Sequence, residues 1–188
     1  NLMYYNSYYW YWENAFDDKW INKVHKLAKK EGIRQGTVGT EKRVDSEMRA
    51  SNICFLDQRW MHDSFRPYID KANKSAGWNF EWYRSEPIQY TEYKLNQFYN
   101  YHADTFPIPT KTGTQRKLSA VISLNDSSEY EGGEFKIMTN PLNIIEVPAL
   151  KKKGTIIVFP STIWHKVEPI TKGKRYSLVV WCEGFDFR

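Results

Sequence analysis

The feature that most constrains the fold is a succession of short β-prone segments that occupies the chain after Gly77. β-Branched and aromatic residues dominate each segment, and turn-forming or charged residues separate one segment from the next. Many short strands at such spacing are typical of an antiparallel β-sandwich or jelly roll. The segments are WNFEWY, IQYTEYKL, FYNYHA, KLSAVISLN, GEFKIM, NIIEV, TIIVFP and RYSLVVWC.

Two amphipathic helices are predicted before these segments. The first is capped by Asp17 or Asp18 and ends at Gly32, and the second runs from near Asp57 to near Gly77. Ahead of them, the aromatic stretch NLMYYNSYYWYWENAF predicts a strand or extended segment packed on the body. The apolar faces of the helices are Phe16, Trp20, Ile21, Val24, Leu27 and Ala28, and Trp60, Met61, Phe65, Tyr68, Ile69 and Ala72.

The stretch from Gly36 to Ala50 combines glycines with alternating charges and lacks periodicity, which predicts an exposed loop of the kind that often forms a lid. We expect one domain over residues 1–188, a length that can bury a core of its own. Within it, residues 1–77 would supply helical support and the lid, and residues 78–188 the jelly-roll core. The fold class is therefore mainly β with flanking helices.

Composition excludes several classes of protein. The net charge of +5 comes from Lys and Arg residues that are scattered among Asp and Glu, so a nucleic-acid partner is not favoured. Cys54 and Cys182 lie far apart and outside any metal-spaced pair, which predicts buried, reduced thiols. No apolar run approaches the roughly twenty residues that cross a bilayer. We expect a soluble, cytoplasmic protein with no membrane partner, and the oligomeric state stays open.

A candidate metal site comes from three residues. His102 and Asp104 are two apart in a segment that reads as a strand, so their side chains should leave the same face and converge on one ion. His165 follows the apolar strand TIIVFP and can supply the third ligand. Two imidazoles and one carboxylate with open positions opposite form the facial triad of non-haem Fe(II) oxygenases. A His-x-Asp pair alone also occurs among packed side chains, so the assignment needs further support.

Arg175 provides that support. It lies ten residues after His165 in KGKRYSLVVW, where a strand would point its guanidinium into an apolar barrel. A buried arginine needs an anion, and its planar fork suits the distal carboxylate of 2-oxoglutarate. Ser177 faces the same way and can donate one more hydrogen bond. The alternative is that Arg175 pairs with a structural glutamate.

From about Arg49 to Trp181 the chain resembles the prolyl 4-hydroxylases of the 2-oxoglutarate oxygenase superfamily. The resemblance is carried, in order, by YKLNQFYNYHAD, QRKLSAVISLN, EYEGGEF and HKVEPITKGKRYSLVVW. It implies a cupin-like double-stranded β-helix, Fe(II) as the metal, and 2-oxoglutarate and O₂ as co-substrates, with ascorbate as a reductant. It also implies that His102, Asp104 and His165 hold iron.

The resemblance extends to the co-substrate and substrate pockets. Arg175 matches the basic residue that binds the tail of 2-oxoglutarate, and Tyr93 matches a tyrosine of the same pocket. Tyr99, Arg116 and Trp181 fall where relatives place an aromatic wall, a guanidinium and an indole around a target proline. A proline ring offers no donor, so aromatic faces and one donor to a backbone carbonyl would suit a proline-containing peptide. The alternatives are a core role for Tyr99 and Trp181 and a surface charge for Arg116.

Some residues depart from the family pattern. Asn96 stands where relatives have glycine, and asparagine tolerates the left-handed conformation that the turn needs. The pair Gly132 and Gly133 between two glutamates is interpreted as a hairpin element. Asp104 argues against a halogenase, which would lack the carboxylate.

Two other functions remain open from the sequence. The same core could oxidise another side chain, a free amino acid or a nucleic acid. It could also be a jelly-roll module that retains a metal without turnover.

Overall fold

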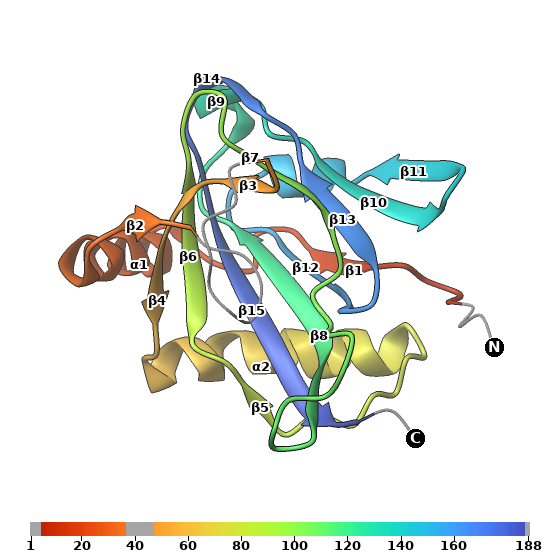
Figure 1. The fold of residues 1–188 in the computed structure, drawn as a ribbon. Helices are drawn as coiled ribbons and strands as arrows, with labels where there is room; N and C mark the ends of the chain where they lie inside the picture. The colour runs from red at the N-terminus through yellow and green to blue at the C-terminus, as the bar shows by residue number, and fades with distance from the viewer. Residues whose placement is uncertain (1–4, 37–46, 187–188) are drawn as a thin grey trace.

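The computed structural model describes residues 5–36 and 47–186, in which two β-sheets stack against each other (Figure 1). The larger sheet has eight strands and the smaller has five. The larger runs in the order β1 (Trp10–Trp12), β12 (Ile156–Pro160), β8 (Thr114–Ser123), β15 (Arg175–Phe185), β6 (Ile88–Tyr93), β4 (Asn52–Leu56) and β2 (Arg34–Gln35), and β5 (Arg84–Ser85) pairs with β15. The smaller runs β11 (Asn143–Glu146), β10 (Phe135–Asn140), β13 (Trp164–Val167), β7 (Phe98–His102) and β3 (Arg49–Ala50).

The remaining elements are short or helical. β14 (Ile170–Gly173) pairs with β9 (Tyr130–Gly132) as a separate ribbon, and single 3-10 turns cover Ser127–Glu129 and Pro148–Lys151. The helices are α1 (Asp18–Glu31) and α2 (Arg59–Ser75). The mainly β jelly roll with flanking helices is therefore confirmed.

The larger sheet is buried on both faces, which explains why its strands read as nearly continuous apolar runs. On β8, Leu118, Ala120 and Ile122 pack with the helices in one core cluster. Val121, which points the other way, belongs to a second cluster between the two sheets. Because side chains alternate along a strand, Ser119 and Ser123 also face the smaller sheet. The inter-sheet space is where the candidate site lies.

The helices follow the sequence prediction closely. Asp17 caps α1 by accepting a hydrogen bond from the Trp20 backbone N–H at 2.8 Å, and Gly32 ends the helix at a φ of 81°. α2 begins two residues after Asp57 and ends at Ser75, before Gly77 at a φ of 72°. Both helices bury their apolar faces on the larger sheet. No helix in the described ranges is long and apolar enough to cross a bilayer.

The segment Trp78–Tyr83 was predicted as a strand and is irregular instead. The segment is hydrogen-bonded to the end of α2. The backbone N–H groups of Trp78 and Asn79 donate to the Asn73 carbonyl, and Phe80 N–H donates to the Asn73 side chain. Trp78, Phe80 and Trp82 thus pack on the helix-side core, and only Tyr83 bonds to β15, through its N–H and the Glu183 carbonyl, just before the two-residue strand β5. High β-propensity reflects suitability for a half-buried surface, and tertiary contacts override it here.

Two boundaries differ from the prediction. Residues 37–46 of the expected lid loop lie outside the described residues, but the loop's last two residues form strand β3 and pair with Phe98 and Tyr99. Arg49 in that strand is buried. The division at residue 77 is also too sharp, because β1, β2 and β4 precede it and belong to the larger sheet. The jelly roll is therefore built from both parts of the chain.

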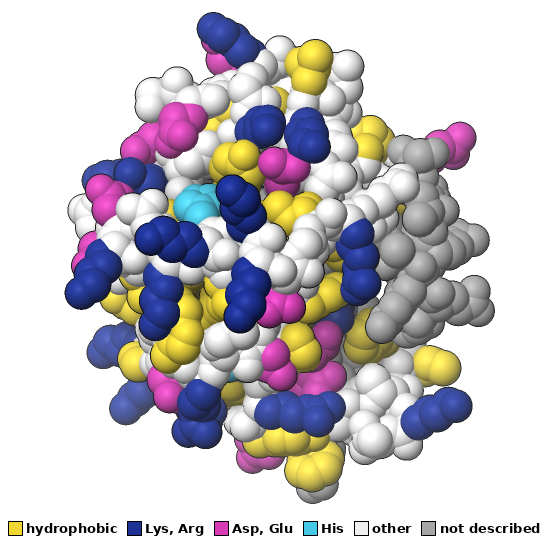
Figure 2. All heavy atoms as spheres, turned by 90° about the vertical axis from the view of Figure 1, so that its left-hand side faces the viewer, with side chains coloured by type: hydrophobic (Ala, Val, Ile, Leu, Met, Phe, Trp, Pro, Cys, Tyr) yellow, Lys and Arg dark blue, Asp and Glu magenta, His cyan; other side chains and the backbone are white. Residues whose placement is uncertain are grey.

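Surface charges and cysteines agree with the sequence reading. On the face that carries α1 and β2, Lys and Arg side chains are spread out and interleaved with Asp and Glu (Figure 2). Cys54 and Cys182 are buried, free thiols. Burial raises the pKa of Cys54 to about 11 and that of Cys182 further, so neither is an activated nucleophile.

Candidate metal centre

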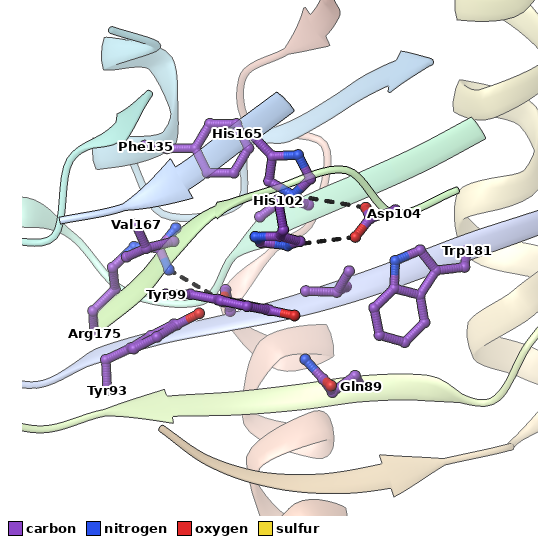
Figure 3. Close-up of a pocket in the computed structure, with 13 residues that line it drawn as sticks. Gln89, Tyr93, Tyr99, His102, Asp104, Phe135, His165, Val167, Arg175 and Trp181 are labelled. Atoms are coloured by element: carbon purple, nitrogen blue, oxygen red, sulfur yellow. Dashed lines mark hydrogen bonds and ion pairs between the residues drawn. The ribbon is translucent and has the colours of Figure 1, made fainter. Parts of the chain in front are cut away.

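Three potential ligands meet between the sheets. His165 on β13 is directly opposite His102 on β7, so the pairing of these two strands brings both imidazoles together. Asp104 joins them, and the ligand atoms of the three residues lie within 4.8 Å of one another. Figure 3 shows the two rings and the carboxylate pointing toward a common centre. The expected cluster of His102, Asp104 and His165 is thus assembled in the structure.

In both histidines a hydrogen bond at Nδ1 orients the ring so that Nε2 faces the proposed metal position. His102 Nδ1 is 2.8 Å from the carbonyl of Asn100, and His165 Nδ1 is 2.9 Å from the carbonyl of Ile163. A carbonyl only accepts, so each Nδ1 carries a proton, and in a neutral ring this leaves the lone pair on Nε2. Both Nε2 atoms face Asp104, at 3.5 Å from His102 to Oδ1 and 3.7 Å from His165 to Oδ2. This is the arrangement in which histidines bind a metal.

The charge states also suit a cation. Burial and the neighbouring His102 lower the pKa of His165 to about 4, so that ring is neutral near pH 7. Burial of Asp104 opposes its ionisation, but the two histidines outweigh burial and hold the pKa of the carboxyl well below its usual range. A neutral His165 ring and an ionised Asp104 suit a divalent cation, because the carboxylate would offset one of its two charges.

One geometric expectation for the cluster was wrong. Asp104 was placed on the same strand as His102, yet β7 ends at His102 and Asp104 lies in the irregular segment beyond it. Its backbone N–H donates to the Ser161 carbonyl at 2.9 Å, and its Oδ2 accepts from Ser119 Oγ at 2.7 Å. Contacts from β8 and from the turn after β12 therefore set its direction.

Arg175 is fully buried at the start of β15, directly opposite Tyr93 on β6. Its Nη1 lies 3.3 Å from Ser177 Oγ, and its Nη2 is buried without a hydrogen-bond partner in the described residues. The alternative of a structural glutamate is not realised among those residues. An unsatisfied buried guanidinium is costly, so this one is suited to an anionic ligand.

Glycine makes room for this arginine. A Cβ at Gly133 would lie 3.0 Å from Arg175 Cδ and 2.6 Å from Ile170 Cδ1, and the residue has a φ of 65°. Gly132 ends β9 and Gly133 follows it, and the missing side chain of Gly133 lets this turn approach the guanidinium stem. Gly133 therefore has a steric role beside Arg175. The hairpin expected at the glycine pair is wrong, because β9 pairs with β14, whereas β10 pairs with β11 and β13.

The three expected substrate residues lie around the cluster in different ways. The Tyr99 ring stacks on His102, with centroids 3.6 Å apart and planes at 14°. Trp181 lines the cavity, and its buried Nε1 has no hydrogen-bond partner in the described part of the chain. Arg116 is not a surface charge, because it is partly buried, lies over the Trp181 ring at 3.9 Å and forms two hydrogen bonds with Glu86.

Other residues of the cavity were missed in the sequence. The cavity is also lined by Gln89, Val121, Phe135, Val167 and Val179. Period-2 alternation was the available signal for two of them. Gln89 lies four residues before Tyr93 on β6, and Val179 lies two after Ser177 on β15, so each shares a face with a predicted residue. Arg49, buried with its guanidinium 4.6 Å from the Tyr99 ring, had no such signal because its strand was read as a loop.

Strand β15 runs along the cavity and contributes residues at both of its ends. Arg175, Ser177, Val179 and Trp181 alternate onto the same face of this strand. At about 3.3 Å per residue, Arg175 and Trp181 are roughly 20 Å apart along the strand. Figure 3 shows the His102, Asp104 and His165 cluster between these two ends, with Arg175 and Tyr93 on one side and Trp181 on the other.

A jelly roll that brings two histidines and one carboxylate to an inner cavity has the architecture of a non-haem Fe(II) oxygenase. Comparison with known families agrees with this class. The profile of the 2OG-Fe(II) oxygenase superfamily matches residues 88–183, which include all three cluster residues and Arg175. The chain belongs to this superfamily.

Relatives and solved structures narrow the similarity. A PKHD-type hydroxylase of Xylella fastidiosa is 33% identical over 108 residues, covering 53% of this chain and 45% of the relative. One from Thermosynechococcus vestitus is 27% identical over 169 residues, covering 89% of this chain and 66% of the relative. The chain thus matches about half the length of the first of these relatives.

Two solved structures share the fold at low identity. A Trichoplax adhaerens prolyl hydroxylase in complex with a hypoxia inducible factor peptide fragment superposes with a TM-score of 0.75, at 18% identity, over 96% of this chain and 84% of that one. A Pseudomonas putida prolyl-4-hydroxylase gives 0.69, at 19% identity, over 94% and 92%. These likenesses show the fold, and the superfamily expected from the sequence is confirmed by the family profile.

Proposed function

We propose that the protein is an Fe(II)- and 2-oxoglutarate-dependent dioxygenase that hydroxylates peptidyl proline at C4. The observation that carries the proposal is one cavity in which the histidine and aspartate cluster lies between two buried donors, Arg175 Nη2 and Trp181 Nε1, that have no hydrogen-bond partner in the described residues. Membership of the superfamily supports the reaction type. The names of the relatives support hydroxylation, and the names of the structural neighbours support proline as the target.

The residues fit the metal that the family implies. His102, His165 and Asp104 would hold Fe(II), since both Nε2 atoms are available and the carboxylate is ionised. Nitrogen and oxygen ligands in this two-to-one set are those of non-haem iron sites. When bound, the metal together with 2-oxoglutarate and O₂ supplies the oxidising chemistry, in which 2-oxoglutarate becomes succinate and CO₂. Ascorbate would act as an external reductant.

The far carboxylate of 2-oxoglutarate would bind at the Arg175 end. The free Nη2 of Arg175 can donate to it, and Ser177 and Tyr93 offer hydroxyls beside the same guanidinium. A charge-assisted hydrogen bond in a buried site is stronger than one in water. These groups would orient the co-substrate with its 2-oxo acid end toward the His102, Asp104 and His165 cluster.

A proline side chain would bind at the opposite end. Tyr99 offers a ring face next to His102, and Trp181 offers a second aromatic surface with an N–H that can donate to a peptide carbonyl. Arg116 would act differently from the sequence expectation. Glu86 holds the Arg116 guanidinium through two hydrogen bonds, so Arg116 would mainly stack on Trp181 and fix the indole. Its Nη1 makes only a weak contact, with the Asp104 carbonyl at 3.4 Å. The peptide would exclude water from the cavity as it binds.

The test is product analysis. Protein incubated anaerobically with Fe(II) and 2-oxoglutarate, then exposed to air with a panel of proline-containing peptides, should form succinate and add one oxygen to proline. Peptides with alanine in place of proline are the matched substrate control. His165→Ala should abolish succinate formation, and full activity in that variant would refute the proposed centre. Succinate without any proline-dependent rise would indicate a different substrate, and metal binding without succinate a non-catalytic module.

The substrate residues are tested separately from the metal. Tyr99→Ala and Trp181→Ala should each lower peptide hydroxylation at least tenfold. Trp181→Ala should leave Fe(II) and 2-oxoglutarate binding nearly unchanged, whereas Tyr99→Ala also removes the ring stacked on His102. Unchanged coupled turnover on proline peptides in both variants would remove proline as the target. It would leave the dioxygenase assignment in place.

A further inference from the structure

Asp104 lies beyond the end of β7, so strand pairing does not hold its backbone in place. β7 ends at His102, so no ladder hydrogen bond fixes the aspartate backbone. The support comes instead from Ser161 in the turn after β12, whose carbonyl accepts from the backbone N–H groups of Asp104 at 2.9 Å and Thr105 at 3.0 Å. The segment that carries the carboxylate is therefore attached to the turn between β12 and β13.

Two buried hydroxyl groups reach the carboxylate itself. Ser119 Oγ on β8 donates to Asp104 Oδ2 at 2.7 Å, and Ser161 Oγ is 2.9 Å from Ser119 Oγ. A hydroxyl has one proton, and Ser119 gives its proton to the carboxylate. Ser161 must then donate to Ser119, so the direction of both bonds is fixed as Ser161 to Ser119 to Asp104. Both serines have no exposed surface, so water does not compete for these bonds.

We propose that Ser119 and Ser161 are positioning residues for Asp104 as a metal ligand, and that this pair of hydroxyls raises the affinity of the site for its metal. This inference rests on the proposed metal centre. Ser119 is well placed for the role because it lies on a central strand, opposite Phe159 on β12 and Trp181 on β15. The Ser119 hydroxyl donates to Asp104 Oδ2, so the carboxylate cannot rotate freely about its Cβ–Cγ bond.

The physical reason is preorganisation. A donor to the carboxylate fixes its direction before the ion arrives, and each hydroxyl that donates along a chain polarises the next. Replacing Ser119 with alanine would leave Asp104 ionised but free to turn. Outer groups of this kind typically change metal affinity by about 10-fold to 100-fold. Ser161→Ala should have a smaller effect, because Ser119 still donates to Oδ2.

The experiment measures metal binding by the complete chain without turnover. Mn(II) titrations followed by electron paramagnetic resonance, and anaerobic Fe(II) titrations, would compare the wild-type protein with Ser119→Ala, Ser161→Ala and Asp104→Ala. Ser123→Ala is the matched control, because Ser123 is an equally buried serine on the same strand that donates to the Asn125 carbonyl. Ser119→Thr restores a hydroxyl and should recover affinity. Thermal melting of each variant reports any general loss of stability.

The expected result is a rise in the dissociation constant of about tenfold or more for Ser119→Ala, a smaller rise for Ser161→Ala and none for Ser123→Ala at a similar melting temperature. Wild-type affinity in folded Ser119→Ala would overturn the inference. If that variant does not fold, Ser161→Ala decides, and affinity equal to that of Ser123→Ala overturns it. Equal affinity of the wild type and Asp104→Ala would instead contradict the metal centre itself.

Discussion

At the scale of single residues, the most informative side chain is Arg175. It is a large, fully buried cation whose Nη2 has no partner in the described residues, and Ser177 and Tyr93 are its polar neighbours. Such a group destabilises the free protein unless an anion binds it. Its burial agrees with the sequence prediction, which rested on a basic residue inside an apolar strand.

Arg175→Met should therefore separate binding from stability. Methionine keeps the length of the side chain without its charge, so the metal-free and co-substrate-free protein should be as stable as the wild type or more stable by about 1 kcal/mol. The Michaelis constant for 2-oxoglutarate should rise at least tenfold, since a buried charged hydrogen bond is lost. Arg59→Met, which alters an exposed arginine on α2, is the control. An unchanged Michaelis constant in Arg175→Met would exclude the predicted co-substrate site.

His165 predicts a dependence of stability on pH. Its pKa is about 4 in the folded protein against an ordinary value of 6.5, because burial and His102 disfavour the charged ring. As pH falls from about 6.5 to about 4, the unfolded chain binds a proton that the folded protein does not, so stability is lost. The slope from this group is at most about 1.4 kcal/mol per pH unit.

Denaturant unfolding of the metal-free protein between pH 4 and pH 7 measures this slope. His165→Gln should show a shallower decline than the wild type over the same range, since the titrating ring is absent. Parallel curves for the two proteins would show that His165 is not held neutral in the fold.

At the scale of elements, the turn between β6 and β7 connects the two sheets and presents Tyr93 and Tyr99 from its two sides. Asn96 occupies the turn with a φ of 62°, in the left-handed region. Its backbone N–H donates to the Ile170 carbonyl at 2.8 Å, which ties the turn to β14. Asparagine in place of the family glycine is therefore compatible with the turn, as predicted.

Substitutions at this turn should follow the backbone conformation. Asn96→Gly should change the free energy of unfolding by no more than about 0.5 kcal/mol, whereas Asn96→Val should lower it by about 1 to 2 kcal/mol, because a β-branched residue is strained at positive φ. Chemical denaturation of the three proteins tests the contrast. Equal stability of Asn96→Val and Asn96→Gly would contradict the left-handed turn.

Elements also show why prediction from the sequence succeeded in some places and failed in others. α1 and β15 carry strong local signals, namely a capped 3.6-residue period and a long β-branched run, and both were predicted. Trp78–Tyr83 carries a β signal too, but Asn73 at the end of α2 binds the backbone of Trp78, Asn79 and Phe80, so no strand forms there. The direction of the Asp104 side chain depends on Ser119 and Ser161, which are distant in the sequence. The spacing of nearby residues therefore could not predict it.

At the scale of the whole molecule, the two sheets and the helices have separate roles. The helices and the larger sheet form one apolar cluster, and the space between the sheets forms a second cluster that adjoins His102, Asp104 and His165. β15 lies in the middle of the larger sheet and carries both Arg175 and Trp181 (Figure 1). A rigid central strand thus fixes the distance between the proposed co-substrate end and the proposed peptide end.

In the proposed reaction, one cavity couples the oxidation of 2-oxoglutarate to the hydroxylation of peptidyl proline. Turnover under oxygen-18 gas, with mass spectrometry of both products, tests it most directly. We expect one oxygen-18 atom in succinate and one in hydroxyproline, with equal amounts of the two products. His165→Ala should form neither product. Unlabelled products, or hydroxyproline formed without succinate, would contradict it.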